Sequence, residues 1–386
     1  MVYILVLIYL ACISLGLPDA LLGSVWPVVS AQFQVPMSYM GIISFLISGF
    51  TVVSSLLTDR LTGRFGTGRV TAFSVALTAV GLFGFATSNR YWLLCLWAIP
   101  YGLGAGSVDA GLNNYVATHY ESRHMSWFHC MWGVGATIGP YVMGAVLTGG
   151  QLWNMGYLYI GIFQVILTVI LLSSIPKWKR VGGEVTETYA PLSLKEILCI
   201  PGVKEVLLIF LCYSAVEAIT GHWASSYLTF HLGMGEEKAA GFAALFYLGI
   251  TVGRGISGFM TYRFSDKQMA YIGMGTVLAG ITIMLASKSE TLTMVGFAMT
   301  GFGSAPIFPC IIHATPTWFG KEHSQGVIGV EMASFYAGTC LFPPAFGFFA
   351  DWVGIGCLPI VLFFILCLML FLHERLYRLT SAKKQL

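Results

Sequence analysis

Residues 16–23 read Gly-Leu-Pro-Asp-Ala-Leu-Leu-Gly, and they lie inside the first long apolar run of the chain. Residues 216–223 read Val-Glu-Ala-Ile-Thr-Gly-His-Trp, inside a later apolar run. The pattern acid-Ala-x-x-Gly therefore occurs twice, and its acids, Asp19 and Glu217, are 198 positions apart. A carboxylate beside a helix-disrupting proline has no place in a simple membrane anchor. The two stretches therefore point to function, and their recurrence indicates an internal repeat.

The composition is that of a membrane protein. Hydrophobic residues make up 56% of the chain and charged residues 10%, and the mean hydropathy is +0.78. Soluble domains carry about 25% charged residues, so this chain has too few polar side chains to cover a water-facing surface. We predict an all-α polytopic membrane protein. The nine cysteines show neither C-x-x-C pairs nor zinc-ligand spacing, so no disulfide framework and no metal site is expected.

Apolar runs of about 20 residues, the length that crosses a bilayer, predict twelve transmembrane helices. The external segments carry Arg90, Lys238 and Lys288, Arg254 lies within a span, and the other Lys and Arg residues fall on the opposite side. The positive-inside rule therefore places both termini in the cytoplasm, and we expect a bacterial inner (plasma) membrane location. The predicted spans lie near residues 3–29, 39–58, 69–87, 91–118, 126–149, 154–175, 204–231, 238–262, 268–286, 290–317, 326–349 and 355–373.

A long polar stretch divides the spans into two groups of six. We predict an N-terminal six-helix bundle over residues 1–175, a cytoplasmic linker over 176–203, and a C-terminal six-helix bundle with a short cytoplasmic tail over 204–386. Short motifs also recur between the halves: GFTV at 49–52 returns as GITV at 249–252, and GLG at 102–104 returns as GFG at 301–303. Two such halves, related by an axis along the membrane normal, are the architecture of a major facilitator.

The segment between spans 2 and 3 supports this resemblance. Residues 59–69 read Asp-Arg-Leu-Thr-Gly-Arg-Phe-Gly-Thr-Gly-Arg. They resemble the cytoplasmic signature of the major facilitator superfamily, G-x-L-x-D-R-x-G-R, with one extra residue and without its leading glycine. The resemblance implies a cytoplasmic latch between helices formed by Asp59, Arg60 and Arg64, with Arg254 as the counterpart in the second half. The alternative is a solvated basic turn that only follows the positive-inside rule.

Four acidic residues fall inside predicted spans: Asp19, Asp109, Glu217 and Glu331. An acid at the bilayer centre costs about 2.5–3.5 kcal/mol on insertion scales, so each is expected to face the bundle interior or a wet cavity. A carboxyl group in a low-dielectric site without a cation readily holds a proton. We therefore predict proton coupling by Asp109, Asp19 and Glu217, whereas Glu331 is expected to be structural or gating. Helix packing through a neighbouring hydroxyl is the alternative for Asp19 and Glu217.

Span 4 carries a further resemblance. Residues 109–116 read Asp-Ala-Gly-Leu-Asn-Asn-Tyr-Val, in which Asp109 and Asn113 share a helix face. Together with Asp19, this stretch resembles the fucose–proton symporter family, which has a span-1 aspartate and a span-4 motif like E-T-A-A-N-P-F-V. The resemblance implies that Asp19 is linked to substrate, that Asp109 is the principal coupling acid and that Asn113 matches the asparagine of the family. Asp109 replaces a glutamate, and Asn114 replaces a proline.

Polar and aromatic side chains of spans 1, 4, 7 and 10 are expected to contact substrate. A tryptophan stacks on the C–H face of a sugar, and an amide both donates and accepts hydrogen bonds. For the tryptophans, a place in the interfacial aromatic belt is the alternative. Pro306 and Pro309 predict a bend in span 10. The predicted substrate-binding residues are Asp19, Trp26, Asn113, Asn114, Glu217, Thr220, His222, Trp223 and His313.

The sequence thus predicts a secondary active transporter, not an enzyme, that couples symport of a sugar or related small polar solute to protons by alternating access. We expect a monomer in the lipid bilayer, without cofactor or nucleic-acid partner. Sodium is an alternative coupling ion, because carboxylate, amide and backbone oxygens also bind it. The alternative function is a proton-coupled antiporter that exports drugs or other amphipathic compounds, because residues 135–144 resemble the G-x-x-x-G-P motif of such antiporters. Helix packing also explains those small residues.

Overall fold

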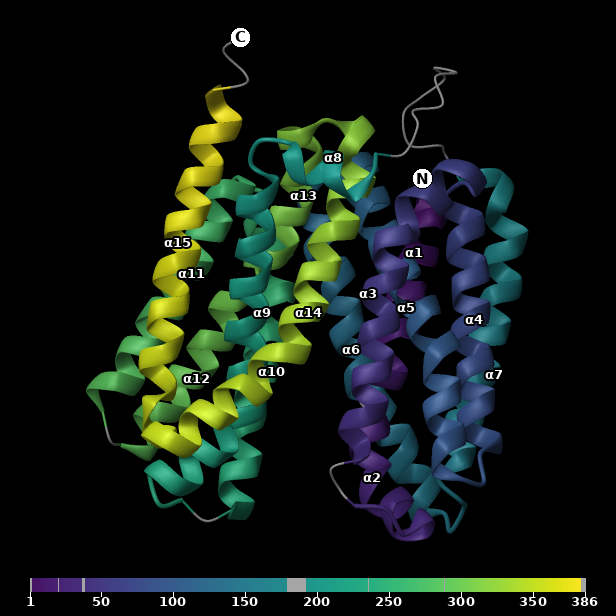
Figure 1. The fold of residues 1–386 in the computed structure, drawn as a ribbon, viewed down its shortest axis with the longest axis horizontal. Coiled ribbons are helices and arrows are strands. Elements are labelled where there is room, and N and C mark those ends of the chain that lie inside the picture. Colours follow the sequence, from purple (N-terminus) through teal and green to yellow (C-terminus); the bar gives the residue numbers. More distant parts are fainter. Residues whose placement is uncertain are drawn as a thin grey trace. The chain divides into compact units, whose positions relative to one another are not determined.

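The computed structural model describes residues 2–19, 21–36, 39–178, 192–234, 236–287 and 289–382. Within these ranges all regular structure is helical, and Figure 1 labels the helices in chain order. Residues 179–191, most of the predicted linker, lie outside the described residues. The linker boundaries therefore stay a prediction.

The contacts divide the chain into two units, and the first contains most of the N-terminal helices. It comprises Met1–Thr118, Phe128–Pro191 and Ile328–Ala333. A short 3-10 turn, Ile175–Lys177, follows its last long helix. The first seven helices are α1 (Val2–Asp19), α2 (Leu21–Phe33), α3 (Met40–Phe65), α4 (Thr67–Thr87), α5 (Tyr91–His119), α6 (Ser122–Thr148) and α7 (Asn154–Ser174).

The second unit comprises His119–Trp127, Leu192–Val327 and Ser334–Leu386. A π-helical turn at Tyr227–His231 extends α9, and a 3-10 turn at Ile355–Cys357 precedes α15. The helices of this part of the chain are α8 (Leu194–Cys199), α9 (Val203–Ser226), α10 (Glu236–Met260), α11 (Asp266–Ala286), α12 (Glu290–Ser304), α13 (Ile307–Phe319), α14 (Lys321–Val353) and α15 (Leu358–Ala382).

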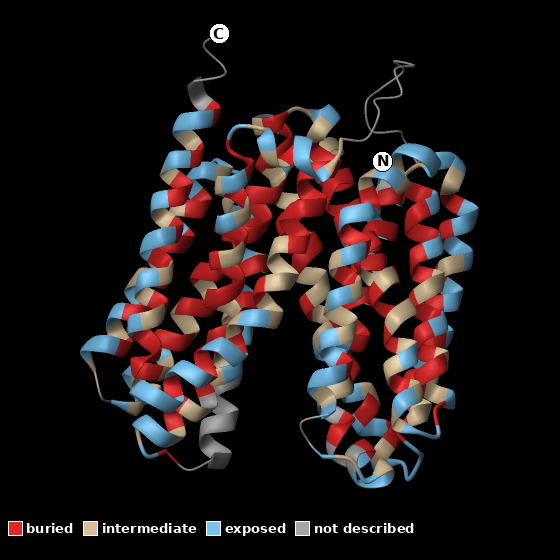
Figure 2. Ribbon diagram, in the orientation of Figure 1, coloured by how far each residue is buried: buried red, intermediate tan, exposed pale blue. Residues whose placement is uncertain are grey.

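Every predicted span falls on one helix or on two consecutive helices. Among the described residues, nine helical segments are long and apolar enough to cross a membrane, and α10 adds a shorter apolar stretch, Leu245–Met260. Figure 2 shows exposed residues recurring along the helices of both units. They include Phe73, Phe348 and Phe364, which are 68%, 78% and 67% exposed. Large apolar side chains left on a surface in this way are typical of contact with lipid.

The sequence predicts a helix end or a bend at three places in the spans. Residues 59–65, predicted to begin a loop, are instead the last turns of α3, and the chain turns at Gly66, whose φ of 83° suits glycine. The predicted bend in span 10 is confirmed: α12 ends at Ser304 and α13 begins after Pro306, which lacks the N–H that a continuous helix needs. In span 1, residue 20 lies outside the described residues, so the break expected near Asp19 stays a prediction.

Glycines in spans 4 and 10 allow equivalent close contacts. A Cβ on Gly102 would clash with a backbone carbonyl of α3, and one on Gly104 would lie 2.5 Å from a carbonyl of α4. In the other unit, Gly301 and Gly303 meet carbonyls of α10 and α11 in the same way. The recurrence of GLG as GFG therefore reflects one packing arrangement used twice, as expected of an internal repeat.

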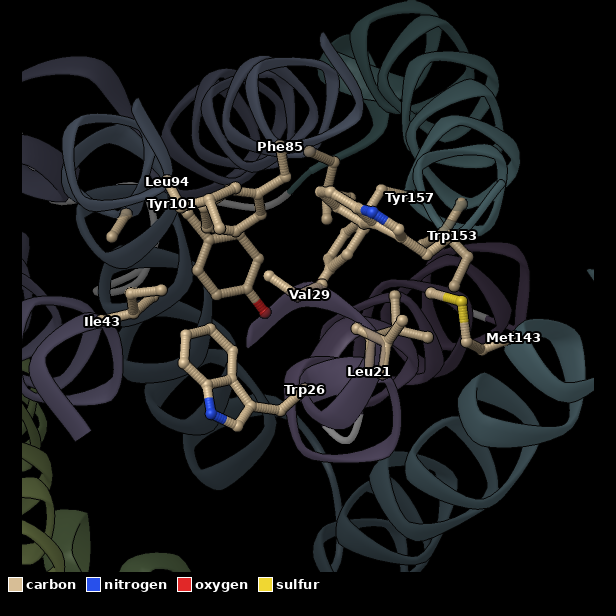
Figure 3. Packing of buried hydrophobic residues seen from close by; sticks show 14 of the residues in the cluster. Leu21, Trp26, Val29, Ile43, Phe85, Leu94, Tyr101, Met143, Trp153 and Tyr157 are labelled. Atoms are coloured by element: carbon tan, nitrogen blue, oxygen red, sulfur yellow. The ribbon is translucent and has the colours of Figure 1, made fainter. Parts of the chain in front are cut away.

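A cluster of buried aromatic and aliphatic side chains joins the helices of the first unit (Figure 3). Trp26 is 1% exposed, and Phe85, Tyr101, Trp153 and Tyr157 are also buried. Phe85 and Tyr157 meet edge to face with ring centroids 5.3 Å apart. Burying a large apolar side chain contributes roughly 1.5–3 kcal/mol. The ring of Tyr101 is therefore packed in this core while its hydroxyl reaches Asp19 of the candidate site.

Candidate functional site

The carboxylate of Asp19 is exposed and is held by two neutral donors. Its Oδ1 accepts a hydrogen bond of 3.0 Å from the Tyr101 hydroxyl, and its Oδ2 accepts one of 2.8 Å from Nε1 of Trp132. Tyr101 belongs to α5 and Trp132 to α6, so three helices meet at this acid. An exposed carboxylate with fixed orientation can accept hydrogen bonds from a hydroxylated solute.

Close contact between α1 and α6 brings Trp132 to Asp19. A Cβ on Gly16 would clash with the carbonyl of Trp132, and Cβ atoms on Gly135 and Gly139 would clash with carbonyls of α1. The two backbones can approach only because these positions lack side chains. The same contacts give a packing explanation for the small residues of the motif at 135–144.

Asp109 lies at one end of a polar chain that runs from α5 to α6. The side-chain N–H of Asn113 donates to Oδ1 of Asp109 at 2.8 Å and to the carbonyl of Asp109 at 3.0 Å. The amide oxygen of Asn113 lies 2.9 Å from Nε2 of His129. Asn113 is 0% and His129 7% exposed. The predicted shared face of Asp109 and Asn113 is confirmed, and the structure adds His129.

Sequence reasoning missed His129, because no spacing rule connects a residue of span 5 to one of span 4. It favoured His222 and His313 among the histidines within the spans. The only available signal was that His129 is a polar residue inside an apolar run. Asp19 and Asp109, the two candidate coupling acids of the first unit, both contact residues of α5, namely Tyr101 and Asn113.

Glu217 of α9 has a cationic neighbour. Nη2 of Arg254, on α10, lies 3.9 Å from Oε2 of Glu217, and the two side chains are 6% and 16% exposed. The phenol of Tyr213, one turn before Glu217, lies within electrostatic reach of both groups. The assumption in the sequence analysis that Glu217, like the other span acids, lies without a cation is therefore wrong. Its predicted place in proton coupling is untested, but an adjacent guanidinium favours the ionised form of an acid.

The other predicted residues of span 7 have local partners. The Thr220 hydroxyl is buried and donates to the carbonyl of Val216 at 2.6 Å. His222 is exposed, and its Nδ1 lies 2.8 Å from the carbonyl of Ala218. Substrate contact by these side chains stays a prediction.

Both predicted tryptophans are packed against protein. Trp26 lies in the core cluster of the first unit (Figure 3). Its ring meets that of Tyr91 edge to face, with ring centroids 6.4 Å apart. Nε1 of Trp223 donates to the carbonyl of Pro343 at 3.0 Å, and its ring packs against Phe346. These contacts favour packing roles, and stacking on a sugar stays untested. Asn114 is likewise fully buried.

His313 joins a polar cluster of the second unit that the sequence did not predict. Its Nδ1 lies 2.6 Å from Oδ2 of Asp266, and its Nε2 lies 3.1 Å from the carbonyl of Tyr120. Asp266, the first residue of α11, also accepts a hydrogen bond from the Ser122 hydroxyl. Residues 119–127 belong to this unit by their contacts. Substrate binding by His313 stays a prediction, although the structure gives both of its ring nitrogens protein partners.

The predicted latch residues occupy two different environments. Arg60 and Arg64 are exposed at the end of α3, where the Arg64 guanidinium lies 5.3 Å from the ring centre of Phe65, and Asp59 is half-buried. Arg254 is instead buried beside Glu217. A latch at Asp59, Arg60 and Arg64 stays a prediction.

These helices and acids define a multi-pass helical membrane transporter, and comparisons with known proteins identify its family. The family model described as Major Facilitator Superfamily matches residues 8–245 and 206–385. The chain belongs to this superfamily, which confirms the predicted fold class and family. The superfamily consists of transporters, in agreement with the prediction that the chain is not an enzyme.

Individual relatives are distant. "Bypass of stop codon protein 6" of Saccharomyces cerevisiae is 24% identical over 384 residues, which cover 90% of this chain and 76% of that protein. "Sodium-dependent glucose transporter 1A" of Mus musculus is 22% identical and covers 86% of this chain and 85% of that protein. The structure is also similar to that of FucP, the E. coli fucose:proton symporter, with a TM-score of 0.76, 15% identity and coverage of 96% of this chain and 98% of that one. At this identity, the structural likeness establishes the fold alone.

Proposed function

We propose that the protein is a proton-coupled symporter of a sugar or a related small polar solute. The observation that carries the proposal is the exposed carboxylate of Asp19, which the neutral donors Tyr101 and Trp132 hold within a membrane helix. A solute rich in hydroxyl groups can donate hydrogen bonds to such a carboxylate. The named substrates of two relatives, fucose and glucose, belong to this class.

Proton coupling is assigned to the first unit. Asp109 is half-buried, and its carboxylate accepts a hydrogen bond from the neutral amide of Asn113, a contact that a protonated carboxyl group can keep. In the proposed cycle, Asp109 takes up the proton while Asp19 accepts hydrogen bonds from the solute. Loss of the charge at the half-buried Asp109 lowers the cost of closing the loaded site to water. Glu217 contributes less, since Arg254 already compensates its charge.

Alternating access is proposed to arise from rocking of the six-helix halves, residues 1–175 against 204–386, around a site near the middle of the membrane. By the positive-inside rule, both termini are proposed to lie in the cytoplasm, and the proposed location is the bacterial inner membrane.

Export of amphipathic compounds receives less support, because the contacts of Gly135 and Gly139 with α1 explain the antiporter-like motif by packing.

Transport by purified protein in proteoliposomes tests the proposal. Radiolabelled L-fucose, D-glucose and a panel of other monosaccharides are offered with an inward proton gradient, with an inward sodium gradient, or with neither. We expect accumulation of at least one sugar with the proton gradient and its collapse on addition of a protonophore. Accumulation that requires sodium would overturn the coupling ion. Failure of every sugar, with proton-driven efflux of cationic dyes, would overturn symport in favour of export.

A further inference from the structure

The side-chain amide of Asn113 connects a candidate coupling acid on one helix to a histidine on the next. An amide has one accepting oxygen and one donating nitrogen, so its orientation determines which group each neighbour meets. Here the nitrogen faces Asp109 at 2.8 Å and the oxygen faces Nε2 of His129 at 2.9 Å. Asn113 is fully buried, so solvent does not replace either contact readily.

The neighbours of the amide fix this orientation. Nε2 of His129 meets an acceptor, so it carries the hydrogen and donates it. A half-turn of the amide would place the oxygen of Asn113 against the carboxylate of Asp109 and its N–H groups against the N–H of His129. The contact of that oxygen with an ionised Asp109 would be repulsive, and the contact with His129 would be repulsive as long as Nε2 keeps its hydrogen. In the tautomer with its hydrogen on Nε2, the histidine therefore holds the amide nitrogen toward Asp109.

We propose that His129 is a positioning residue for proton coupling at Asp109, acting through the amide of Asn113. The inference rests on the function proposed above for Asp109. It adds that α6 controls the hydrogen bond received by the coupling acid of α5. Through Asn113, the described contacts connect the titratable ring of His129 to Asp109.

The same geometry bears on the coupling ion. A sodium site at Asp109 would use the amide oxygen of Asn113 as a second ligand, because cations bind oxygen atoms and not N–H groups. That oxygen is engaged by His129, and the face turned toward Asp109 is a donor. A protonated carboxyl group, in contrast, still accepts this hydrogen bond at its carbonyl oxygen, so the amide keeps its orientation in both protonation states. The arrangement therefore favours protons over sodium.

Infrared difference spectroscopy of the purified full-length protein tests the inference without a substrate. The carbonyl stretch of protonated Asp109 is assigned as the band that Asp109→Asn removes. His129→Phe keeps a ring of similar size but removes the donor, whereas His129→Gln keeps an N–H donor close to the position of Nε2. We expect the Asp109 band to move to higher frequency in His129→Phe, because the amide no longer donates steadily to that carbonyl. We expect His129→Gln to restore the wild-type frequency.

A double-variant cycle distinguishes the relay from a general packing effect. Asn113→Leu alone is expected to move the band, and His129→Phe in that background is expected to add no further shift. If His129→Phe does not yield folded protein, the smaller His129→Leu takes its place, and the His129→Gln spectrum is compared with it.

An unchanged band in the folded Phe or Leu variant, or an equal shift in the Gln variant, would overturn the role of His129. Neither result concerns sugar transport, so the proposed function would stand. If Asp109→Asn removes no band at any pH at which the protein stays folded, Asp109 does not hold a proton. Its coupling role and the inference about His129 then both fail. Absence of proton-driven transport in wild-type proteoliposomes, with the band effects present, would overturn the proposed function alone.

Discussion

Asp19 and Glu217 occupy matching positions of the internal repeat, yet their surroundings differ. Asp19 is exposed and accepts hydrogen bonds from the neutral donors Tyr101 and Trp132. Glu217 is mostly buried and lies 3.9 Å from a guanidinium nitrogen of Arg254. Both units thus contain the acid, but its partners are neutral in the first unit and cationic in the second.

The two units share their helix packing but differ in the charges around the repeated acid. The close approach of helices at Gly102 and Gly301 is the same in both units, because packing requires the same missing side chain. Charge compensation depends on single side chains of neighbouring helices: among the described contacts, Glu217 has a cation beside it, whereas Asp19 has two neutral donors. We conclude that the repeat determines the scaffold, and that the electrostatics of each half determine its proposed part in coupling.

The largest expected effect comes from removing the cation of the second unit. Arg254→Gln leaves the carboxylate of Glu217 without its compensating charge in a poorly solvated position. Breaking a buried ion pair costs about 3–5 kcal/mol, and we expect the lower end because the pair is 3.9 Å apart. Thermal unfolding in detergent should show a clear loss of stability. The matched control, Arg254→Gln with Glu217→Gln, removes both charges and should recover most of it. Equal instability of both variants would contradict the pairing.

A glycine of α6 tests the scaffold around Asp19. Gly139→Ala places a methyl group against a carbonyl of α1, whereas Gly144→Ala, on the same helix, places one where no atom lies within 4 Å. Overpacking of this kind costs about 1–3 kcal/mol. We therefore expect Gly139→Ala to lower the melting temperature and sugar uptake, and Gly144→Ala to leave both unchanged. Indistinguishable variants would mean that α1 and α6 do not pack as described.

The hydrogen bond from Trp132 to Asp19 provides a smaller test. Trp132→Phe keeps the aromatic ring but removes the N–H donor, a change of roughly 0.5–1.5 kcal/mol. We expect the KM for the transported sugar to rise about two- to tenfold, since 1.4 kcal/mol corresponds to a factor of ten. Trp223→Phe is the control in the other unit, because its N–H donates to the carbonyl of Pro343 and not to an acid. Trp223→Phe should lower the melting temperature but leave the KM for the transported sugar nearly unchanged.

The smallest effect is expected at Glu196, an acid away from both Asp19 and Glu217. The pKa of Glu196 is lowered because the side chain and backbone N–H of Ser193 hydrogen-bond to its carboxylate at the start of α8. A group whose folded-state pKa lies below its unfolded value stabilises the fold above the unfolded pKa, and this stabilisation is lost as the pH falls through the folded pKa. In Glu196→Gln, the melting temperature should fall slightly less as the pH is lowered, and proton coupling should not change. A change in coupling would show that exposed acids also influence transport.

The sequence was sufficient for the fold because hydrophobic runs, the distribution of Lys and Arg, and proline positions act locally. The bend at Pro306 follows from the chemistry of one residue, and the contact between Asp109 and Asn113 follows from helical spacing. The end of α3 was misplaced, because charged residues from position 59 onward read as a loop although they continue the helix to Phe65.

Contacts between helices were harder to predict, because they depend on how each helix is rotated about its own axis. The pairs Glu217–Arg254, His313–Asp266 and Asn113–His129 join different helices, and one sequence contains no rule that sets this rotation. Trp26 shows the same limit: an aromatic residue near the end of a span suits a belt, a cavity wall or a core, and the structure places it in the core.

We propose that the acids of the first unit carry most of the coupling, while Glu217, compensated by Arg254, contributes less. Simultaneous recording of sugar uptake and proton entry in proteoliposomes tests it most directly, with wild type, Asp109→Asn and the Glu217→Gln, Arg254→Gln double variant. We predict that the double variant moves sugar and protons together as wild type does, and that Asp109→Asn exchanges sugar without proton entry. Proton entry retained in Asp109→Asn and lost in the double variant would contradict the account.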